Sequence, residues 1–235
     1  MSFQHLIISR FNVGLYPSEE AASWMDYRLK IFDYYCYPSI ASQTNQNFTW
    51  LVLFDSRTSE KHRKIISKYK KVTPVYYVRK PGSLQTIVKE SIKKSVNPKA
   101  EFIITTRVDV DDMLNKDFVK ETQIQMPKKD NVQLVFSLGY VLRLHPNILL
   151  EREYIYNQFA SYIEKNSGNI KTVWFAAHGT IHKTAETKCI NKDRMWCWTL
   201  HNKHLGRTSK IKNYRLKTVN VDLLQRQFVY KKGFK

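Results

Sequence analysis

Residues 101–112 read EFIITTRVDVDD, an apolar run that ends in a basic residue and an acidic cluster. A compact apolar run between polar residues predicts a buried β-strand that ends at Arg107. Three earlier runs have the same character, namely Leu6–Ile8, Trp50–Phe54 and Val75–Arg79. The sequence therefore predicts four strands in the first half of the chain.

Helical periodicity separates these strands. Apolar residues recur every three or four positions from Ala22 to Cys36, and Pro38 is expected to end that helix. A basic helix is expected from about Ser59 to Tyr69, and an apolar face predicts another over residues 84–92. Strands that alternate with helices build a mostly parallel sheet covered on both faces, so the expected fold class is α/β.

The second half of the chain is less regular. The runs VQLVFSL (132–138) and GYVLRL (139–144) predict two strands, and residues 149–164 fit either a helix or a loop. No repeat or low-complexity linker marks a domain boundary, so a single domain is expected. Residues 207–235 hold nine Lys or Arg and a single acid, Asp222. This segment is expected to be a solvated basic face, with membrane or polyanion contact as the alternative.

Composition and charge exclude several classes of protein. The 235 residues are 43% hydrophobic and 13% aromatic, which excludes a disordered chain. No apolar run reaches the roughly 20 residues of a membrane span, and the first residues lack a signal peptide's order, so a cytoplasmic protein is expected. Three cysteines without C-x-x-C spacing predict neither a disulfide framework nor a structural zinc site. The net charge of +19 favours phosphates, acidic glycans or anionic lipids as partners.

The acidic cluster after Arg107 is the clearest candidate for chemistry. Ligands of open α/β sheets bind beyond the carboxyl ends of the strands, where Asp109, Asp111 and Asp112 are expected to lie. Crowded carboxylates repel one another, so a divalent cation is expected between them. Oxygen ligands suit Mg²⁺ or Mn²⁺, whose other positions take water and substrate phosphates. The alternative is an acidic turn in which Asp112 caps a helix and Asp109 pairs with Arg107.

Four motifs in this order resemble those of a known family. They are SRFN at Ser9–Asn12, W-x-x-x-F-D at Trp50–Asp55, T-T-R-x-D-x-D-D at Thr105–Asp112, and W-x-x-x-x-H at Trp196–His201. Together they resemble the rhamnosyltransferases of the glycosyltransferase-A superfamily. The resemblance implies a Rossmann-like, mixed but mostly parallel sheet flanked by helices in one domain over residues 1–206. Its nucleotide-sugar half would cover about 1–115 and its acceptor half about 116–206.

The resemblance also implies an activity. A sugar, L-rhamnose by analogy with the family, would move from a UDP-, dTDP- or GDP-linked donor to a hydroxyl of a glycan, glycolipid or glycoprotein. Mn²⁺ or Mg²⁺ would stabilise the departing diphosphate as a Lewis acid. Carried over position by position, the donor-binding residues are Arg10, Phe11, Asp55, Arg107, Asp109 and Asp111. Asp111 and Asp112 would hold the metal, and Asp112 would thereby act in catalysis.

Two further roles depend on the second half of the chain. In glycosyltransferase-A enzymes a C-terminal histidine often completes the metal shell, which makes His201 a candidate ligand; the alternative is a histidine satisfied by a backbone carbonyl. An inverting transfer needs a carboxylate that accepts the acceptor's proton. Glu164, in FASYIE, matches an F-x-S-x-x-E run of the family and is the first candidate for this base. The alternatives for the base are Glu151, Glu153 and Asp193.

The sequence also leaves two other functional classes open. The charge and fourteen Tyr residues favour a nucleic-acid-binding protein, but carboxylates at the predicted crevice would repel a phosphate backbone that comes without metal. A nucleotidyltransferase or nuclease with two cations would need another carboxylate from a neighbouring strand, for which Asp55 is the obvious candidate. Trp174, Trp196 and Trp198 would suit either a platform for a sugar ring or core packing. We expect no nucleic-acid partner.

Overall fold

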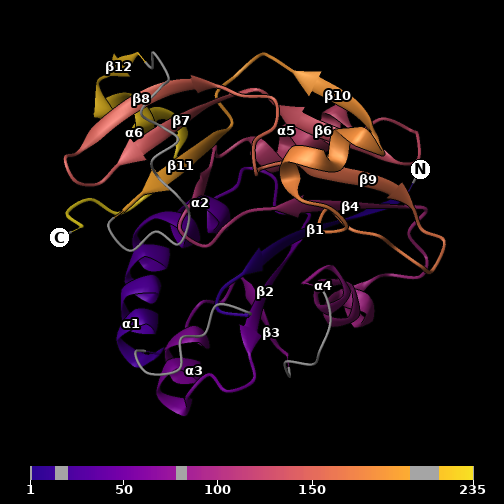
Figure 1. The fold of residues 1–235 in the computed structure, drawn as a ribbon, viewed down its shortest axis with the longest axis horizontal. Helices are drawn as coiled ribbons and strands as arrows, with labels where there is room; N and C mark the ends of the chain where they lie inside the picture. Colours follow the sequence, from indigo (N-terminus) through magenta and orange to yellow (C-terminus); the bar gives the residue numbers. More distant parts are fainter. Residues whose placement is uncertain (1, 14–20, 78–83, 202–216, 235) are drawn as a thin grey trace.

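The computed structural model describes residues 2–13, 21–77, 84–201 and 217–234, and Figure 1 shows their arrangement. Its main element is a seven-stranded sheet with the order β10-β6-β9-β4-β1-β2-β3. In chain order these strands are β1 (Phe3–Arg10), β2 (Thr49–Asp55), β3 (Val72–Tyr77), β4 (Phe102–Arg107), β6 (Val132–Phe136), β9 (Ser161–Lys165) and β10 (Glu186–Ile190).

Most pairs in this sheet are parallel. Strand β1 pairs in parallel with β2 and β4, and β2 pairs in parallel with β3. Only β9 runs the other way, between β4 and β6. The expected mixed, mostly parallel α/β sheet is confirmed. Because β1, β2 and β4 are parallel, Arg10, Asp55 and Arg107 end at the same edge.

A smaller sheet extends from that edge and begins directly after the acidic cluster. Its order is β12-β8-β7-β11-β5, with β5 (Met113–Leu114), β7 (Leu138–Arg143), β8 (Ile148–Glu153), β11 (Trp196–Leu200) and β12 (Thr218–Val219). Strand β11 pairs with β7 so that Trp196 lies opposite Gly139. A Cβ at position 139 would lie 2.1 Å from the indole of Trp196, so a glycine is needed there.

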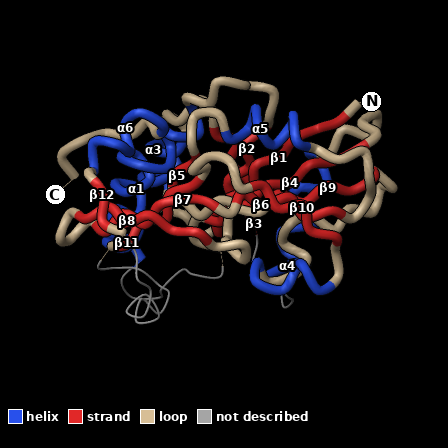
Figure 2. Tube along the Cα trace, turned by 90° about the horizontal axis from the view of Figure 1, so that it is seen from above, coloured by secondary structure: helices blue, strands red, loops and turns tan. Residues whose placement is uncertain are grey.

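Helices cover both faces of the large sheet (Figure 2). The helices on this sheet are α1 (Ala21–Ile31), α2 (Tyr37–Ala41), α3 (Glu60–Ile66), α4 (Leu84–Ile92) and α5 (Phe118–Gln125), whereas α6 (Leu224–Gln227) packs on the small sheet. One apolar cluster joins Ile66 of α3 and Phe118 of α5 to the sheet, and a second joins Val88 of α4 to the opposite face. No helix in the described ranges is long and apolar enough to cross a membrane.

Three local features differ from the sequence prediction. The first helix does not end at Pro38: it widens into a π-helix over Phe32–Cys36 and continues as α2, with Pro38 in the first turn, where a missing N–H costs little. Residues 149–164 lie mostly in β8, β9 and the connection between them. Strand β3 begins earlier than expected, at Val72, and the expected end at Arg79 lies outside the described residues.

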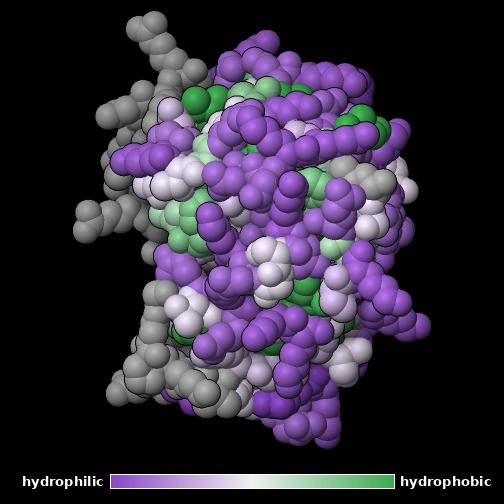
Figure 3. All heavy atoms as spheres, turned by 90° about the vertical axis from the view of Figure 1, so that its right-hand side faces the viewer, coloured by the Kyte–Doolittle hydropathy of each residue, from purple (hydrophilic) through white to green (hydrophobic). Residues whose placement is uncertain are grey.

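The face of the molecule in Figure 3 is mostly hydrophilic. In Figure 3, hydrophilic side chains cover most of the face in view, and apolar atoms reach it in small, separate areas. Such scattered apolar groups are normal on a protein surface. The basic segment expected over 207–235 lies partly outside the described residues; from residue 217 on, it forms β12, α6 and a chain end whose Phe234 packs near Tyr34 and Tyr35.

Buried His5 makes the stability of the fold depend on pH. Its side chain lies on β1 with Nε2 2.8 Å from Thr106 Oγ1, and burial lowers its pKa to about 3. An unfolded histidine titrates near 6.5. The unfolded chain therefore binds more protons between pH 6.5 and 3, and stability falls as pH falls through that window.

We expect the free energy of unfolding, measured in urea, to fall by about 2 kcal/mol from pH 7 to pH 5 through this residue alone. His5→Gln should remove that part of the slope because the amide does not titrate. His145→Gln is the matched control, because His145 is exposed. Equal slopes for wild type and His5→Gln would refute the assignment.

Candidate active site

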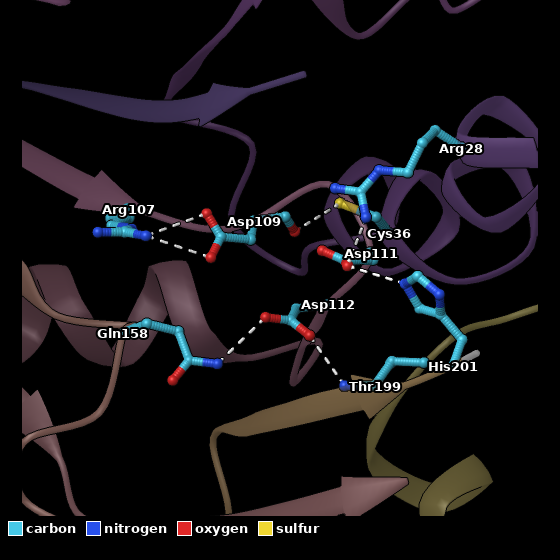
Figure 4. Close-up of polar contacts among 9 residues, drawn as sticks. All are labelled: Arg28, Cys36, Arg107, Asp109, Asp111, Asp112, Gln158, Thr199 and His201. Atoms are coloured by element: carbon cyan, nitrogen blue, oxygen red, sulfur yellow. Dashed lines mark hydrogen bonds and ion pairs between the residues drawn. The ribbon is translucent and has the colours of Figure 1, made fainter. Parts of the chain in front are cut away.

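Three carboxylates lie in the turn that joins β4 to β5, where the two sheets meet (Figure 4). The turn is closed by a hydrogen bond from Asp112 N to Asp109 O of 3.0 Å. The side chains do not share one partner: Asp109, Asp111 and Asp112 each contact a different set of residues (Figure 4). Their mutual repulsion is therefore offset by separate partners.

Asp111 joins three segments that are far apart in the sequence. Its Oδ2 atom accepts a hydrogen bond from Arg28 Nη1 at 2.7 Å, and Nε2 of His201 lies 3.1 Å from the same oxygen. Arg28 lies on α1, and His201 follows β11 directly. Both side chains are buried, as is Asp111. The turn, α1 and the small sheet thus meet at one carboxylate.

Asp112 faces the small sheet. Its Oδ1 accepts a hydrogen bond from Thr199 N at 2.8 Å, and its Oδ2 accepts one from Gln158 Nε2 at 3.3 Å. Burial, followed by the charges of Asp111 and Asp109, raises the pKa of this carboxyl well above its usual range. Because Thr199 lies two residues before His201, Asp112 fixes the end of β11 that presents the histidine.

Asp109 faces the large sheet. Both of its carboxylate oxygens lie 3.3 Å from Arg107 Nη2, and its backbone oxygen accepts a weak bond from Cys36 Sγ at 3.7 Å. The Asp109–Arg107 pair of the acidic-turn alternative is therefore present. The helix cap of that alternative is not, because the Asp112 carboxylate binds Thr199 and Gln158.

Two arginines lie against one indole beside Asp109. The Cζ atom of Arg107 is 4.0 Å from the ring centroid of Trp174, and that of Arg10 is 5.7 Å from it. Burial lowers the pKa of Arg10; Asp109 opposes this, whereas Arg107 and Arg28 add to it. Burial, then the charge of Arg107, lowers the pKa of His178 to about 4. Positive charge is thus concentrated at the ends of β1 and β4.

Several buried nitrogen atoms around this charge have no hydrogen-bond partner within the described ranges. They are Arg28 Nε, Arg107 Nε, Trp174 Nε1 and His178 Nδ1. Buried polar atoms in folded proteins are nearly always paired, so each of these calls for an explanation. A ligand with several anionic oxygens would satisfy donors and cations together.

Two of the expected donor-binding residues have other surroundings. Arg57 engages both carboxylate oxygens of Asp55, through Nε at 2.8 Å and Nη2 at 2.9 Å, at the end of β2. Phe11 is fully buried, stacked on Phe54 at 5.0 Å and edge-on to Phe32 at 5.5 Å. The structure therefore places Phe11 in the core, because the aromatic cluster under α1 takes up its ring.

Glu164 is separated from the acidic cluster. It lies on β9 opposite Ile103, near the amino end of β4, whereas the cluster follows the carboxyl end, so at least roughly 13 Å of strand separates them. Its carboxylate accepts hydrogen bonds from Lys171 N at 2.7 Å and Thr172 N at 2.8 Å. Burial raises its pKa, and the two backbone bonds oppose that shift. Glu164 anchors the loop that leads to Trp174, rather than facing the site.

The alternative candidates for the catalytic base contact residues outside the acidic cluster. Glu151 pairs with Arg194 at 3.1 Å, and Glu153 accepts a hydrogen bond from Asn191 at 3.1 Å. Asp193 lies 4.0 Å from Lys192. None of these interactions links a carboxylate to Asp109, Asp111 or Asp112.

Sequence reasoning missed Arg28 and Gln158. A signal for Arg28 is present: it lies three residues after Met25 and four before Phe32, on the apolar face of the predicted helix. A charge on a buried helical face needs a partner, so this position should have been paired with the acidic cluster. Gln158 carries no such signal, because its chain segment has no periodicity.

Comparison with known proteins identifies the family. Residues 18–213 match the family described as "Putative rhamnosyl transferase". The chain belongs to this family. The match confirms the family resemblance; it includes three of the four motifs, and Ser9–Asn12 precedes it. No curated protein sequence matches this rhamnosyltransferase-family chain.

Solved structures of S. aureus TarS are similar to this family member in fold. The TarS 1–349 complex with UDP-GlcNAc has a TM-score of 0.51 at 14% identity, over 87% of this chain and 60% of TarS 1–349. A second structure of TarS 1–349 has a TM-score of 0.49 at 15% identity, over 85% of this chain and 60% of TarS 1–349. The chain thus spans about 60% of the length of these structures, and at this identity the likeness concerns the fold alone.

We expect Glu164→Ala to lower the free energy of unfolding by about 2–4 kcal/mol, because the buried Thr172 N–H and the part-buried Lys171 N–H lose a charged acceptor. Urea denaturation measures this. Glu186→Ala is the matched control: its carboxylate forms an exposed ion pair with Lys129, and its loss should cost less than about 0.5 kcal/mol. A loss below about 1 kcal/mol for Glu164→Ala would refute the anchoring role.

Proposed function

We propose that this protein transfers a sugar from a nucleoside-diphosphate donor to a hydroxyl acceptor, with L-rhamnose as the sugar that the family favours. The observation that carries the proposal is the set of arginines beside the acidic turn, together with buried nitrogens that have no hydrogen-bond partner among the described residues. A diphosphate supplies several anionic oxygens in the space of one small ligand. The UDP-, dTDP- and GDP-linked sugars all meet this requirement.

Arg10 and Arg107 are the proposed diphosphate ligands. Guanidinium groups bind phosphate oxygens through two parallel hydrogen bonds, and Trp174 holds both groups at the strand ends. Negative charge grows on the diphosphate as the sugar leaves. Cations that are already in place stabilise that charge without having to reorganise.

The donor atoms at Asp111 fit Mn²⁺ or Mg²⁺. Asp111 Oδ2 and His201 Nε2 are 3.1 Å apart, close to the separation of about 3.0 Å between neighbouring ligands of an octahedral ion with bonds of about 2.1 Å. No group of three His, Cys, Asp or Glu suited to a metal occurs in the described part of the chain. Two protein ligands suffice where diphosphate and water complete the shell. Bound there, the ion would supply Lewis acidity to the leaving group.

Asp112 has a different role in this proposal. Both of its oxygens already accept hydrogen bonds, from Thr199 and Gln158. We therefore assign the metal to Asp111 and His201 and give Asp112 the positioning of His201. The charge of +19 supports an acceptor that is an acidic glycan, glycolipid or glycoprotein, and peripheral contact with an anionic membrane stays a prediction.

The two-cation nuclease or nucleotidyltransferase is less well supported. It needs a second carboxylate at the site, and the candidate was Asp55. Arg57 binds both oxygens of Asp55, so this acid is already neutralised.

We expect UDP-, dTDP- or GDP-linked sugars to raise the thermal midpoint of the wild type, more so with Mn²⁺, because a ligand of the native state stabilises it. Asp111→Asn should lose the Mn²⁺-dependent part and weaken donor affinity tenfold or more with Mn²⁺ present. Asp33→Asn is the control, since Asp33 pairs with Lys231 away from the cluster. If none of these sugar nucleotides binds the wild type, with or without Mn²⁺, the proposed function is wrong.

A second variant tests whether Trp174 supports donor binding by Arg10 and Arg107. Trp174→Ala removes the ring under Arg10 and Arg107 and should weaken donor affinity roughly tenfold, the effect of about 1–2 kcal/mol of cation–π interaction. Isothermal titration measures the affinity. Phe48→Ala is the control, because Phe48 lies under Lys71 just before β2, at the other edge of the sheet. Unchanged donor affinity in Trp174→Ala would contradict the proposed role of Trp174 in holding the two arginines.

A further inference from the structure

One carboxylate oxygen of Asp111 contacts two side chains, the cation Arg28 and the proposed metal ligand His201. Arg28 Nη1 lies 2.7 Å from Asp111 Oδ2, and His201 Nε2 lies 3.1 Å from the same atom (Figure 4). The side chains of Arg28 and Asp111 are only 6% and 7% exposed. A divalent ion held by Asp111 and His201 would take the position next to this oxygen. A guanidinium at 2.7 Å and the ion would then compete for it.

The position of Arg28 has a clear electrostatic cause. Asp111 is buried beside two other carboxylates, and an unpaired buried charge costs several kcal/mol. Helix α1 brings Arg28 to it from the buried face, where the guanidinium Cζ also lies 5.4 Å from the ring centroid of Trp24. The guanidinium therefore supplies the positive charge that offsets this buried carboxylate.

Building on the proposed function, we propose that Arg28 is a cationic placeholder for the divalent ion. It holds the Asp111 carboxylate in the free protein and moves to a phosphate oxygen when the nucleotide diphosphate arrives. That movement leaves Asp111 Oδ2 to the ion. The nucleotide and the ion then bind with positive coupling, each raising the affinity of the other by the same factor.

Two observations favour movement toward the diphosphate. Arg28 Nε is buried without a hydrogen-bond partner among the described residues, so the guanidinium has a donor to spare. The positive charge of Arg28 also helps to lower the pKa of Arg10, so the two guanidinium groups repel each other. A diphosphate between them would turn this repulsion into a shared attraction.

The test is Mn²⁺ binding itself, measured from the electron paramagnetic resonance signal of free Mn²⁺, with and without UDP, dTDP or GDP. Wild type should bind Mn²⁺ weakly alone and at least tenfold more tightly with the nucleotide that it recognises. Arg28→Gln should bind Mn²⁺ at least tenfold more tightly than wild type without nucleotide, because Asp111 Oδ2 is released. The nucleotide should then enhance the Mn²⁺ affinity of Arg28→Gln by less than threefold.

Further variants keep the test decisive. Arg28→Lys keeps the positive charge and should give a Mn²⁺ affinity between those of wild type and Arg28→Gln, which a loss of folding would not produce. Arg63→Gln is the matched control: Arg63 also stacks on an aromatic ring, that of Tyr76 at 4.1 Å, and bonds to backbone oxygens outside the cluster. It should behave as wild type.

Two outcomes would overturn the placeholder: Mn²⁺ affinity of Arg28→Gln without nucleotide equal to or below that of wild type, or no Mn²⁺ binding by Arg28→Gln at all. If the variant that gives either outcome still binds nucleotide, the outcome does not count against the proposed transferase activity. Failure of every nucleotide and nucleotide sugar to bind would instead count against the proposed function, and the nucleotide-free Mn²⁺ comparison would still decide the role of Arg28.

Discussion

The buried carboxylate of Asp111 is the constraint on which the arrangement of the site depends. Removing a carboxylate from water costs several kcal/mol unless a partner of opposite charge and further hydrogen bonds replace the solvent. Here the partners come from α1, through Arg28, and from the residue after β11, through His201. The fold therefore holds a helix, a turn and the small sheet together at the point where a ligand would bind. The atoms that stabilise the fold here are also those to which we assign the metal.

The acids of this chain differ in role because their surroundings differ. Asp112 and Glu164 are both buried, and burial raises the pKa of both. Asp112 accepts a backbone bond at the end of the small sheet, next to the predicted metal ligand. Glu164 accepts two backbone bonds at the far end of β4 and secures the loop that carries Trp174. Asp112 therefore positions His201, and Glu164 positions the loop that carries Trp174. The two acids differ because they lie at opposite ends of β4.

The arginines beside the acidic turn also differ from the other basic residues in their surroundings. Arg28 binds Asp111 and Arg107 binds Asp109, on opposite sides of the acidic turn (Figure 4), and Arg10 lies with Arg107 against Trp174. Among the described residues, Arg28 Nε and Arg107 Nε are buried without hydrogen-bond partners, which is uncommon for buried polar atoms. Such preorganised donors suit a leaving group that gains negative charge, which is the chemistry expected of glycosyl transfer from a diphosphate.

The sequence alone determined the four strands in the first half of the chain and the place of the acidic turn. Runs such as Trp50–Phe54 must be buried on both faces, and the residues after parallel strands must share one edge, so Asp109–Asp112 could be located without coordinates. Tertiary structure decided what the pattern could not: that Pro38 lies within a helix, that Glu164 sits at the far end of β4, and that Arg28 reaches Asp111. Those outcomes depend on strand direction and helix docking, which arise from contacts between distant segments and leave no period in the local sequence.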